Sequence, residues 1–230
     1  MRYFKQQIRT FIPALTCIGS LFLAQNTVAT PINGLGLPAA HPDLTGGSII
    51  DFESNANGDV AITFSYADAT MTGNNVLRIT NGFDRSFNVT GNSLALTSND
   101  RTEEVNFNFL SPVDAFGFNF GGADQQWHLI AYSAANTILD DLIIAPFGDA
   151  NNGEWFGIST PGIASAKLYN TAFDTGNDTG TVDYVVLDNF TYMQSVPEPT
   201  SLALMSLGLA GLGFSRRAIT QRRSEKECNC

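Results

Sequence analysis

The carboxylates in this chain that could bind a metal ion begin with Asp51 and Glu53. They stand two residues apart in an apolar run, and residues spaced this way on a β-strand project from the same face of the sheet. Calcium takes about six to eight oxygen ligands, from carboxylates, amides and backbone carbonyls. The pair therefore supplies two ligands of suitable chemistry. The alternative is that both are solvated strand residues.

Three aromatic residues, Trp127, Tyr132 and Trp155, could form a stacking platform for sugars. A pyranose ring has an apolar C–H face that packs on an aromatic plane. His128 and Glu154 stand beside the two tryptophans, where they could bind hydroxyl groups. A tryptophan at the end of a strand also packs readily into the core of a sandwich. Glycan binding and core packing are therefore both open at these positions.

Catalytic residues are hard to find. The chain has two histidines, His41 and His128, and it contains no Gly-x-Ser-x-Gly, His-Glu-x-x-His or phosphate-binding glycine motif. Glycosidases use two carboxylates that flank one bond. The adjacent pairs here, such as Asp140 and Asp141, would point to opposite faces of a strand. We therefore expect a non-catalytic protein.

Short runs of alternating apolar and polar residues dominate residues 30–195. In residues 105–109 aromatic side chains alternate with amides, and residues 116–120 repeat the pattern, as in strands with one buried face. Clusters of Gly, Asn and Thr, such as residues 72–75, predict turns. The remaining predicted strands are residues 48–52, 60–66, 93–97, 127–133, 137–144, 155–159, 163–169 and 182–192. The pattern predicts an all-β domain of about ten strands, an antiparallel β-sandwich.

Three segments, in their order along the chain, resemble a secreted jelly roll similar to carbohydrate-binding modules. They are residues 50–53, 109–118 and 185–190. In jelly rolls of this kind the first and last strands pair, so the resemblance implies that the last strand brings two more oxygen ligands to the first carboxylates. The alternative is that the aspartate of the last strand caps a hairpin. The predicted structural Ca²⁺ site comprises Asp51, Glu53, Asp188 and Asn189.

Charge and cysteine content limit the partners of the domain. Residues 30–195 contain four basic residues and nineteen carboxylates, a net charge of −15 compared with −10 for the whole chain. Such a surface repels nucleic acid and anionic lipid, so we expect no nucleic-acid partner. The three cysteines lie outside this segment, which therefore has no internal disulfide. A large core or a bound cation has to supply the missing stability.

The C-terminus combines a proline motif, an apolar run and a basic tail. The prolines keep residues 196–199 extended and accessible. Residues 201–214 carry no charge and predict a membrane helix, although their helical length of about 21 Å is below the hydrocarbon thickness of about 30 Å. The basic tail, residues 215–230, suits the cytoplasmic side of a membrane. The candidate sorting residues are Val196, Pro197, Glu198, Pro199, Arg216 and Arg217.

A Pro-Glu-Pro motif, an apolar segment and an arginine cluster, in this order at the C-terminus, resemble the PEP-CTERM sorting signal of Gram-negative bacteria. The resemblance implies that a membrane processing enzyme of the exosortase type recognises the signal. It also implies that the C-terminal helix anchors the chain in the membrane before processing. The alternatives are a plain membrane anchor and a buried helix with a basic end.

The N-terminus predicts a signal peptide over residues 1–29. Basic residues precede an apolar run at residues 11–24. Thr27 and Ala29 are small residues at the −3 and −1 positions of a cleavage site before Thr30. We therefore expect the chain to be exported through the inner membrane.

Together these parts predict a signal peptide at residues 1–29, a β-sandwich at 30–195 and a sorting signal at 196–230. The leading hypothesis is an exported, exosortase-sorted protein of the cell surface or extracellular matrix. It would associate with exopolysaccharide and have no catalytic activity. The alternatives are a calcium-stabilised carbohydrate-binding module and a secreted glycan hydrolase, for which no motif is present.

Overall fold

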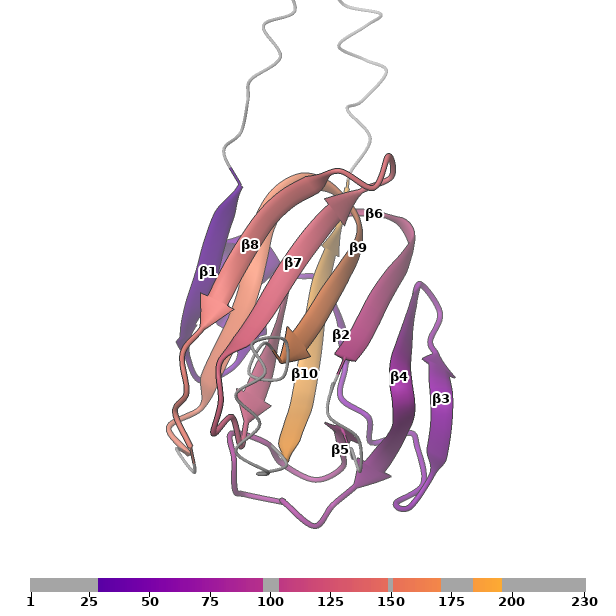
Figure 1. The fold of residues 1–230 in the computed structure, drawn as a ribbon, viewed down its shortest axis with the longest axis vertical. Helices are drawn as coiled ribbons and strands as arrows, with labels where there is room; N and C mark the ends of the chain where they lie inside the picture. The colour runs from indigo at the N-terminus through magenta and orange to yellow at the C-terminus, as the bar shows by residue number, and fades with distance from the viewer. Residues whose placement is uncertain (1–28, 97–103, 149–150, 171–183, 196–230) are drawn as a thin grey trace, which may run out of the picture.

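The computed structural model describes residues 29–96, 104–148, 151–170 and 184–195 (Figure 1). The predicted signal helix and membrane helix lie outside these ranges. Among the residues described, no helix is long and apolar enough to cross a membrane. The described residues form two short 3₁₀ helices, η1 (Pro38–Ala40) and η2 (Pro42–Leu44), and ten strands. The strands are β1 (Thr30–Leu35), β2 (Ser48–Ile50), β3 (Val60–Ser65), β4 (Ala69–Thr80), β5 (Ser93–Leu96), β6 (Glu104–Gly121), β7 (Trp127–Ser133), β8 (Ile138–Ile144), β9 (Glu154–Asn170) and β10 (Val185–Gln194).

All strand pairs are antiparallel, and two long strands divide the network into two layers. The first half of β6 pairs with β4, whereas its second half pairs with β10. Likewise the first half of β9 pairs with β1 and the second half with β7. The register between β6 and β9 shifts between Asn108 and Val113, where the two strands pass from one layer to the other. This architecture confirms the predicted antiparallel β-sandwich.

Aromatic residues from both layers fill the core. Phe107 from β6 stacks on Phe190 from β10 with ring centroids 4.8 Å apart, and Phe118 stacks on the same ring at 6.0 Å. Phe116 and Phe120 are also fully buried. The alternation of phenylalanines with amides therefore marked the buried face correctly. Each buried aromatic side chain contributes about 1.5–3 kcal/mol through the hydrophobic effect.

Long-range pairing overrides three local patterns. The runs at residues 105–109 and 116–120 are parts of β6, and those at 155–159 and 163–169 are parts of β9. The predicted turn at residues 72–75 is wrong, because these residues lie inside β4, where Gly73 pairs with Val105 of β6. A side chain at Gly73 would come within 2.5 Å of the Asn75 carbonyl oxygen. This glycine permits a close backbone approach within a strand instead of a turn.

The chain enters and leaves the sandwich at the same end. β1 begins at Thr30, the residue that follows the predicted signal cleavage, and β10 ends at Gln194. Figure 1 shows both of these ends at the top of the molecule, whereas the start of β10 and the loop of residues 81–92 lie at the bottom. The sandwich therefore has one end next to its terminal segments and one end far from them.

Candidate functional site

The structure corrects the placement of Asp51 and Glu53. β2 ends at Ile50, and the backbone turns left-handed at Phe52, with φ of 60°. The turn buries the Phe52 ring edge-on against Tyr66, with centroids 5.9 Å apart. Because of this turn, Asp51 and Glu53 do not lie on one face of a strand as predicted.

The pairing expected between this region and the last strand is confirmed. β2 pairs with β10 through Ile50 and Phe190. The pairing brings Asp188 close enough to Asp51 and Glu53 for their charges to raise its pKa. We call Asp51, Glu53 and Asp188 the acidic cluster.

Backbone N–H groups donate to all three carboxylates of the acidic cluster, and Asp51 Oδ1 accepts from Glu53 N at 3.2 Å. Three consecutive residues of one loop donate to three different carboxylates: Thr90 N to Asp188 Oδ2 at 3.0 Å, Gly91 N to Asp84 Oδ1 at 2.8 Å, and Asn92 N to Glu53 Oε1 at 2.8 Å. The other oxygen of Asp188 accepts from Asn189 N at 2.6 Å. The loop therefore connects segments that are distant in the sequence.

Asp188 is the buried member of the acidic cluster, with 1% of its surface exposed. Burial raises the pKa of Asp188 to about 6, and the charges of Glu53 and Asp51 act in the same direction, whereas the hydrogen bonds from Thr90 and Asn189 lower it. Burial, assisted by the charge of Asp51, also raises the pKa of Tyr66 to about 12. Burial and the neighbouring negative charges therefore act together against ionisation of both groups.

Three of the four predicted calcium ligands, the carboxylates, lie near one another, whereas the Asn189 side chain is engaged elsewhere. Asn189 turns its side chain to Asn119, donating from Nδ2 to Oδ1 at 3.2 Å. Within the described ranges, no group of three or more His, Cys, Asp or Glu residues is arranged to hold a metal ion. The calcium site at Asp51, Glu53, Asp188 and Asn189 therefore stays a prediction.

Both tryptophans of the predicted sugar platform lie in the core, so of the two alternatives left open by the sequence the structure shows core packing. Trp127 is fully buried and packs edge-on against Phe120 at 5.5 Å. Trp155 is 3% exposed and is covered by η2 through Leu44 and by the His41 ring at 5.4 Å. Neither indole presents a face on which a sugar could stack. Tyr132 is half-buried on β7, and its contact with a sugar stays a prediction.

The six predicted sorting residues, Val196, Pro197, Glu198, Pro199, Arg216 and Arg217, lie outside the described residues. The structure does describe the residue that precedes them. Ser195 N donates to the Pro112 carbonyl oxygen at 3.3 Å, and the Ser195 hydroxyl donates to Asp114 Oδ1. The sandwich therefore holds the chain up to the start of the proline motif.

A network of asparagines was missed by the sequence analysis. It lines a cavity of about 290 Å³ where Asn88 and Asn151 meet Asn119 and Asn189. Asn88 Nδ2 donates to the Phe120 carbonyl oxygen at 2.8 Å, and Asn88 N donates to Asn151 Oδ1 at 2.9 Å. These bonds attach the loop of residues 81–92 to the sheet. The available signal was Asn119, an amide on the face of β6 opposite its phenylalanines.

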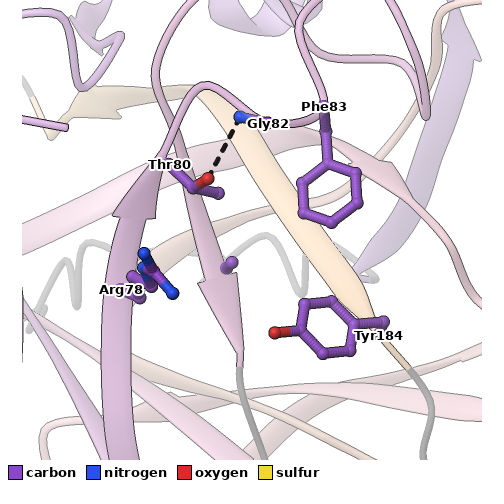
Figure 2. A pocket seen from close by; sticks show the side chains of 6 residues that line it. Arg78, Thr80, Gly82, Phe83 and Tyr184 are labelled. Atoms are coloured by element: carbon purple, nitrogen blue, oxygen red, sulfur yellow. Dashed lines mark hydrogen bonds between the residues drawn. The ribbon is translucent and has the colours of Figure 1, made fainter. Parts of the chain in front are cut away.

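A second cavity, which we call the outer pocket, lies on the outer surface of β4, β5 and the start of β10. Its volume is about 360 Å³, and its lining residues are Arg78, Thr80, Gly82, Phe83, Ala95 and Tyr184. Figure 2 shows Arg78 and Thr80 on one side and the rings of Phe83 and Tyr184 on the other. The two ring centroids are 5.9 Å apart.

Strand alternation explains why these side chains face outwards. Leu77 and Ile79 on β4 are buried in the core, so the intervening Arg78 and the following Thr80 point to the opposite face. Arg78 is paired with Ala95 on β5. The sequence signal was therefore present in the alternation of β4, but the other lining residues come from distant segments.

The basic side chains of the described residues differ in their partners. Lys167 Nζ lies 2.6 Å from Glu104 Oε2, and Arg85 Nε lies 4.0 Å from Asp84 Oδ2. No ion pair involves Arg78 within the part of the chain that the structure describes. The outer pocket therefore contains a positive charge, on Arg78, that no described carboxylate neutralises through an ion pair.

One histidine–carboxylate pair invites comparison with a catalytic dyad. His128 Nδ1 lies 3.0 Å from Asp141 Oδ1, and its Nε2 lies 3.2 Å from the Gln126 amide nitrogen. In a triad, the second ring nitrogen must contact a hydroxyl or thiol nucleophile. Here that nitrogen contacts an amide, so this pair is not arranged as a nucleophilic triad.

Comparisons with known proteins identify the C-terminal signal. Residues 195–217 match the model of the PEP-CTERM protein-sorting motif. The match contains all six predicted sorting residues and confirms the predicted signal. The motif implies export, membrane anchoring at the C-terminus and processing by exosortase. A comparison with curated proteins finds no match.

Several solved structures are similar to the chain. A DUF4465 family protein from Bacteroides caccae has 11% identity and a TM-score of 0.39, with 65% of this chain and 100% of that chain covered. A Clostridium perfringens ZmpB structure, with two family 32 carbohydrate-binding modules and an M60 catalytic domain, has 10% identity and a TM-score of 0.36, covering 73% and 17% of the two chains. The family 32 carbohydrate-binding module from Streptococcus pneumoniae EndoD has 10% identity and a TM-score of 0.28, covering 66% and 99%.

Proposed function

We propose that this chain is an exported, exosortase-sorted protein of the cell surface or extracellular matrix. Its β-sandwich associates with exopolysaccharide and has no catalytic activity. One observation carries the proposal: the sorting motif at residues 195–217 begins directly where β10 ends at Gln194. Because the sandwich already holds Ser195, processing after this point would leave the domain intact.

The positions at which the sandwich begins and ends support a protein that exposes one end of its domain to the outside. Thr30 and Gln194 lie at one end of the sandwich, and the loop of residues 81–92 lies at the other (Figure 1). The ten residues of β10 span about 33 Å at the usual strand rise. A chain anchored through its C-terminus would therefore present the distal end away from the membrane.

The environment of the polar residues supports a non-catalytic role. The second nitrogen of His128 contacts an amide, and Asp188 accepts two backbone hydrogen bonds. These groups are engaged in structural contacts and do not converge on an open site. A secreted hydrolase is therefore the weakest of the three predicted functions.

Processing can be tested with the full chain in a host that contains exosortase. We expect the mature protein to lack its C-terminal segment, and the triple variant P197A/E198A/P199A to accumulate as a membrane-bound precursor. Fractionation and mass measurement of the C-terminus give the readout. The exposed Pro161→Ala variant, in β9, is the control for loss of a proline. A mature chain that still ends at Cys230 would contradict processing and indicate a plain anchor.

Association with exopolysaccharide needs a separate measurement. We expect the processed protein to remain with the matrix of a polymer-producing strain and to enter the medium of a strain that makes no polymer. Equal release from the two strains would contradict the association without affecting the sorting result.

A calcium-stabilised carbohydrate-binding module is the second candidate. The acidic cluster favours it, because the charges of Glu53 and Asp51 oppose ionisation of the buried Asp188. A bound cation would relieve this repulsion and join β2 to β10. The calcium dependence of stability, described below, tests this candidate.

A further inference from the structure

The outer pocket has the chemistry of a receptor for an acidic sugar. We propose that it binds a hexuronic acid residue of an acidic polysaccharide, with Arg78 holding the carboxylate and the rings of Phe83 and Tyr184 packing on the sugar. This inference rests on the proposed association with exopolysaccharide and specifies the sugar class. It does not depend on sorting.

A small residue, Ala95, lies between the strands that line the pocket. Arg78 on β4 is paired with Ala95 on β5, and Ala95 is paired in turn with Val186 on β10. Ala95 is short, and it packs with Val186 against Phe83 and Phe87, so it is only 1% exposed. The cavity of about 360 Å³ lies within the range of about 300–1,000 Å³ typical of small-molecule sites. One or two sugar units are therefore a suitable occupant.

The charge of the pocket selects an anion. Residues 30–195 carry nineteen carboxylates and four basic residues, yet no described carboxylate forms an ion pair with Arg78. A guanidinium group binds a carboxylate through two parallel hydrogen bonds. The net charge of the domain opposes the approach of an acidic polymer, as it opposes nucleic acid, but salt screens this repulsion beyond about 8 Å at physiological ionic strength, whereas the contact with Arg78 is direct. The contact with Arg78 therefore dominates recognition of the acid group.

The aromatic rings and two hydroxyl groups of the pocket can contact the uncharged part of the sugar. Phe83 and Tyr184 contact each other at an angle of 46°, and Tyr184 is 47% exposed. In Figure 2 the Tyr184 hydroxyl points to the side of the pocket that carries Arg78. Thr80 Oγ1 accepts a hydrogen bond from Gly82 N at 3.1 Å, and its own O–H has no acceptor among the described residues. The pocket thus offers an apolar surface together with hydroxyl groups that can bind sugar hydroxyls.

The pocket is also located where a polymer can reach it. It is formed by the end of β4 and by the residue that precedes β10, and both lie at the end of the sandwich opposite Thr30 and Gln194 (Figure 1). A chain anchored at its C-terminus would hold this pocket towards the outside. An extended polysaccharide could therefore bind there before and after processing.

The test uses the full chain, purified in detergent, and titration calorimetry at about 0.15 M salt, where the Debye length is about 8 Å. The probes are tetragalacturonate, its methyl ester, which has the same rings without the charge, and tetraguluronate, a second hexuronate. We expect the acid to bind at least about tenfold more tightly than the ester, because hydrogen bonds to charged groups contribute about 1.5–3 kcal/mol. Equal binding of acid and ester, or no binding of tetragalacturonate and of tetraguluronate, would overturn the inference.

Matched variants identify the residues responsible. Arg78→Gln should reduce acid binding about tenfold and leave ester binding unchanged, whereas Arg85→Gln, which removes another exposed arginine, should change neither. Tyr184→Ala should weaken both ligands, and Leu110→Ala, which removes an exposed apolar side chain of β6 outside the pocket, should weaken neither. Equal effects of Arg78→Gln and Arg85→Gln would place the binding elsewhere and overturn the assignment. Thermal unfolding of each variant verifies that it is folded.

Sorting and sugar binding can fail independently. Purified full chain needs no exosortase for the titration, so a negative result there refutes the hexuronate pocket and leaves the processing experiment intact. Conversely, a chain that binds tetragalacturonate but retains Cys230 in cells would refute processing and preserve the pocket.

Discussion

The acidic cluster and the outer pocket both border the loop of residues 81–92. The charged groups of these two sites differ in whether the protein supplies them with partners. Glu53 and Asp188 of the acidic cluster accept hydrogen bonds from the backbone N–H groups of Asn92 and Thr90. In the outer pocket, Phe83 of the same loop stands near Arg78, which has no ion pair among the described residues. The first group stabilises the fold, whereas the second leaves a charge available for a ligand.

The backbone of the loop explains this difference. Its φ values are positive at Arg85, Phe87, Asn88 and Gly91, so consecutive N–H groups turn away from any strand partner. Buried or partly buried donors need acceptors, and carboxylates are strong ones. The acidic residues here are therefore structural partners of a loop, and their replacement should affect stability more than binding.

The largest loss of stability should come from replacing an aromatic residue of the core. Trp127→Ala removes a fully buried ring that packs on Phe120, so we expect the free energy of unfolding to fall by roughly 3–5 kcal/mol. Urea unfolding of the full chain in detergent provides the measurement. The partly exposed Tyr132→Ala variant is the control. Loss of less than about 1 kcal/mol for Trp127→Ala would place Trp127 outside the core.

The next effect is a dependence of stability on pH through Asp188. Its pKa is about 6 in the folded protein, above the ordinary value of 3.8, so the folded state binds its proton more tightly than the unfolded state. The contribution of Asp188 to stability should therefore be complete below about pH 4 and fall by roughly 3 kcal/mol as the pH rises through 6.

The Asp188→Asn variant should lose this pH dependence. The amide oxygen can accept only part of the hydrogen bonds that the carboxylate accepts, so the comparison concerns the slope with pH and not the absolute stability. The exposed Asp59→Asn variant is the control and should keep the slope of the original chain. Equal slopes in all three proteins would show that Asp188 is not the group responsible.

Calcium should act on the same cluster. If Asp51, Glu53, Asp188 and Asn189 bind Ca²⁺, stability at neutral pH should increase by about 2.7 kcal/mol at a hundredfold excess over Kd. Magnesium should substitute poorly, because it requires a tighter octahedral shell. Thermal unfolding in EDTA and in millimolar calcium gives the comparison. An equal response of the D51A/D188A variant would indicate general screening of the acidic surface.

The smallest effect should come from the outer pocket. Arg78 and Tyr184 are exposed, so Arg78→Gln and Tyr184→Ala should change the free energy of unfolding by no more than about 0.5 kcal/mol. Urea unfolding measures this directly. A loss above about 2 kcal/mol would mean that the pocket residues serve the fold, and the contrast between the two groups would disappear.

The sequence by itself determined the sorting signal and the class of fold. Residues 195–217 form a linear signal that is recognised through its order of prolines, apolar residues and arginines, so no tertiary structure is needed to identify it. The alternation at residues 105–109 and 116–120 determined the buried face of β6, because strand periodicity is a local property.

Only the tertiary structure decided which residues can act as a site. The left-handed turn at Phe52 takes Asp51 and Glu53 off the strand, and packing against η2 covers Trp155. The outer pocket forms because three strands and one loop place Arg78 beside rings that are distant in the sequence. Local patterns fix the face of a strand on which a side chain lies. Its neighbours depend on which strands pair and which loops cover them, and those long-range contacts are decided by the packing of the whole core.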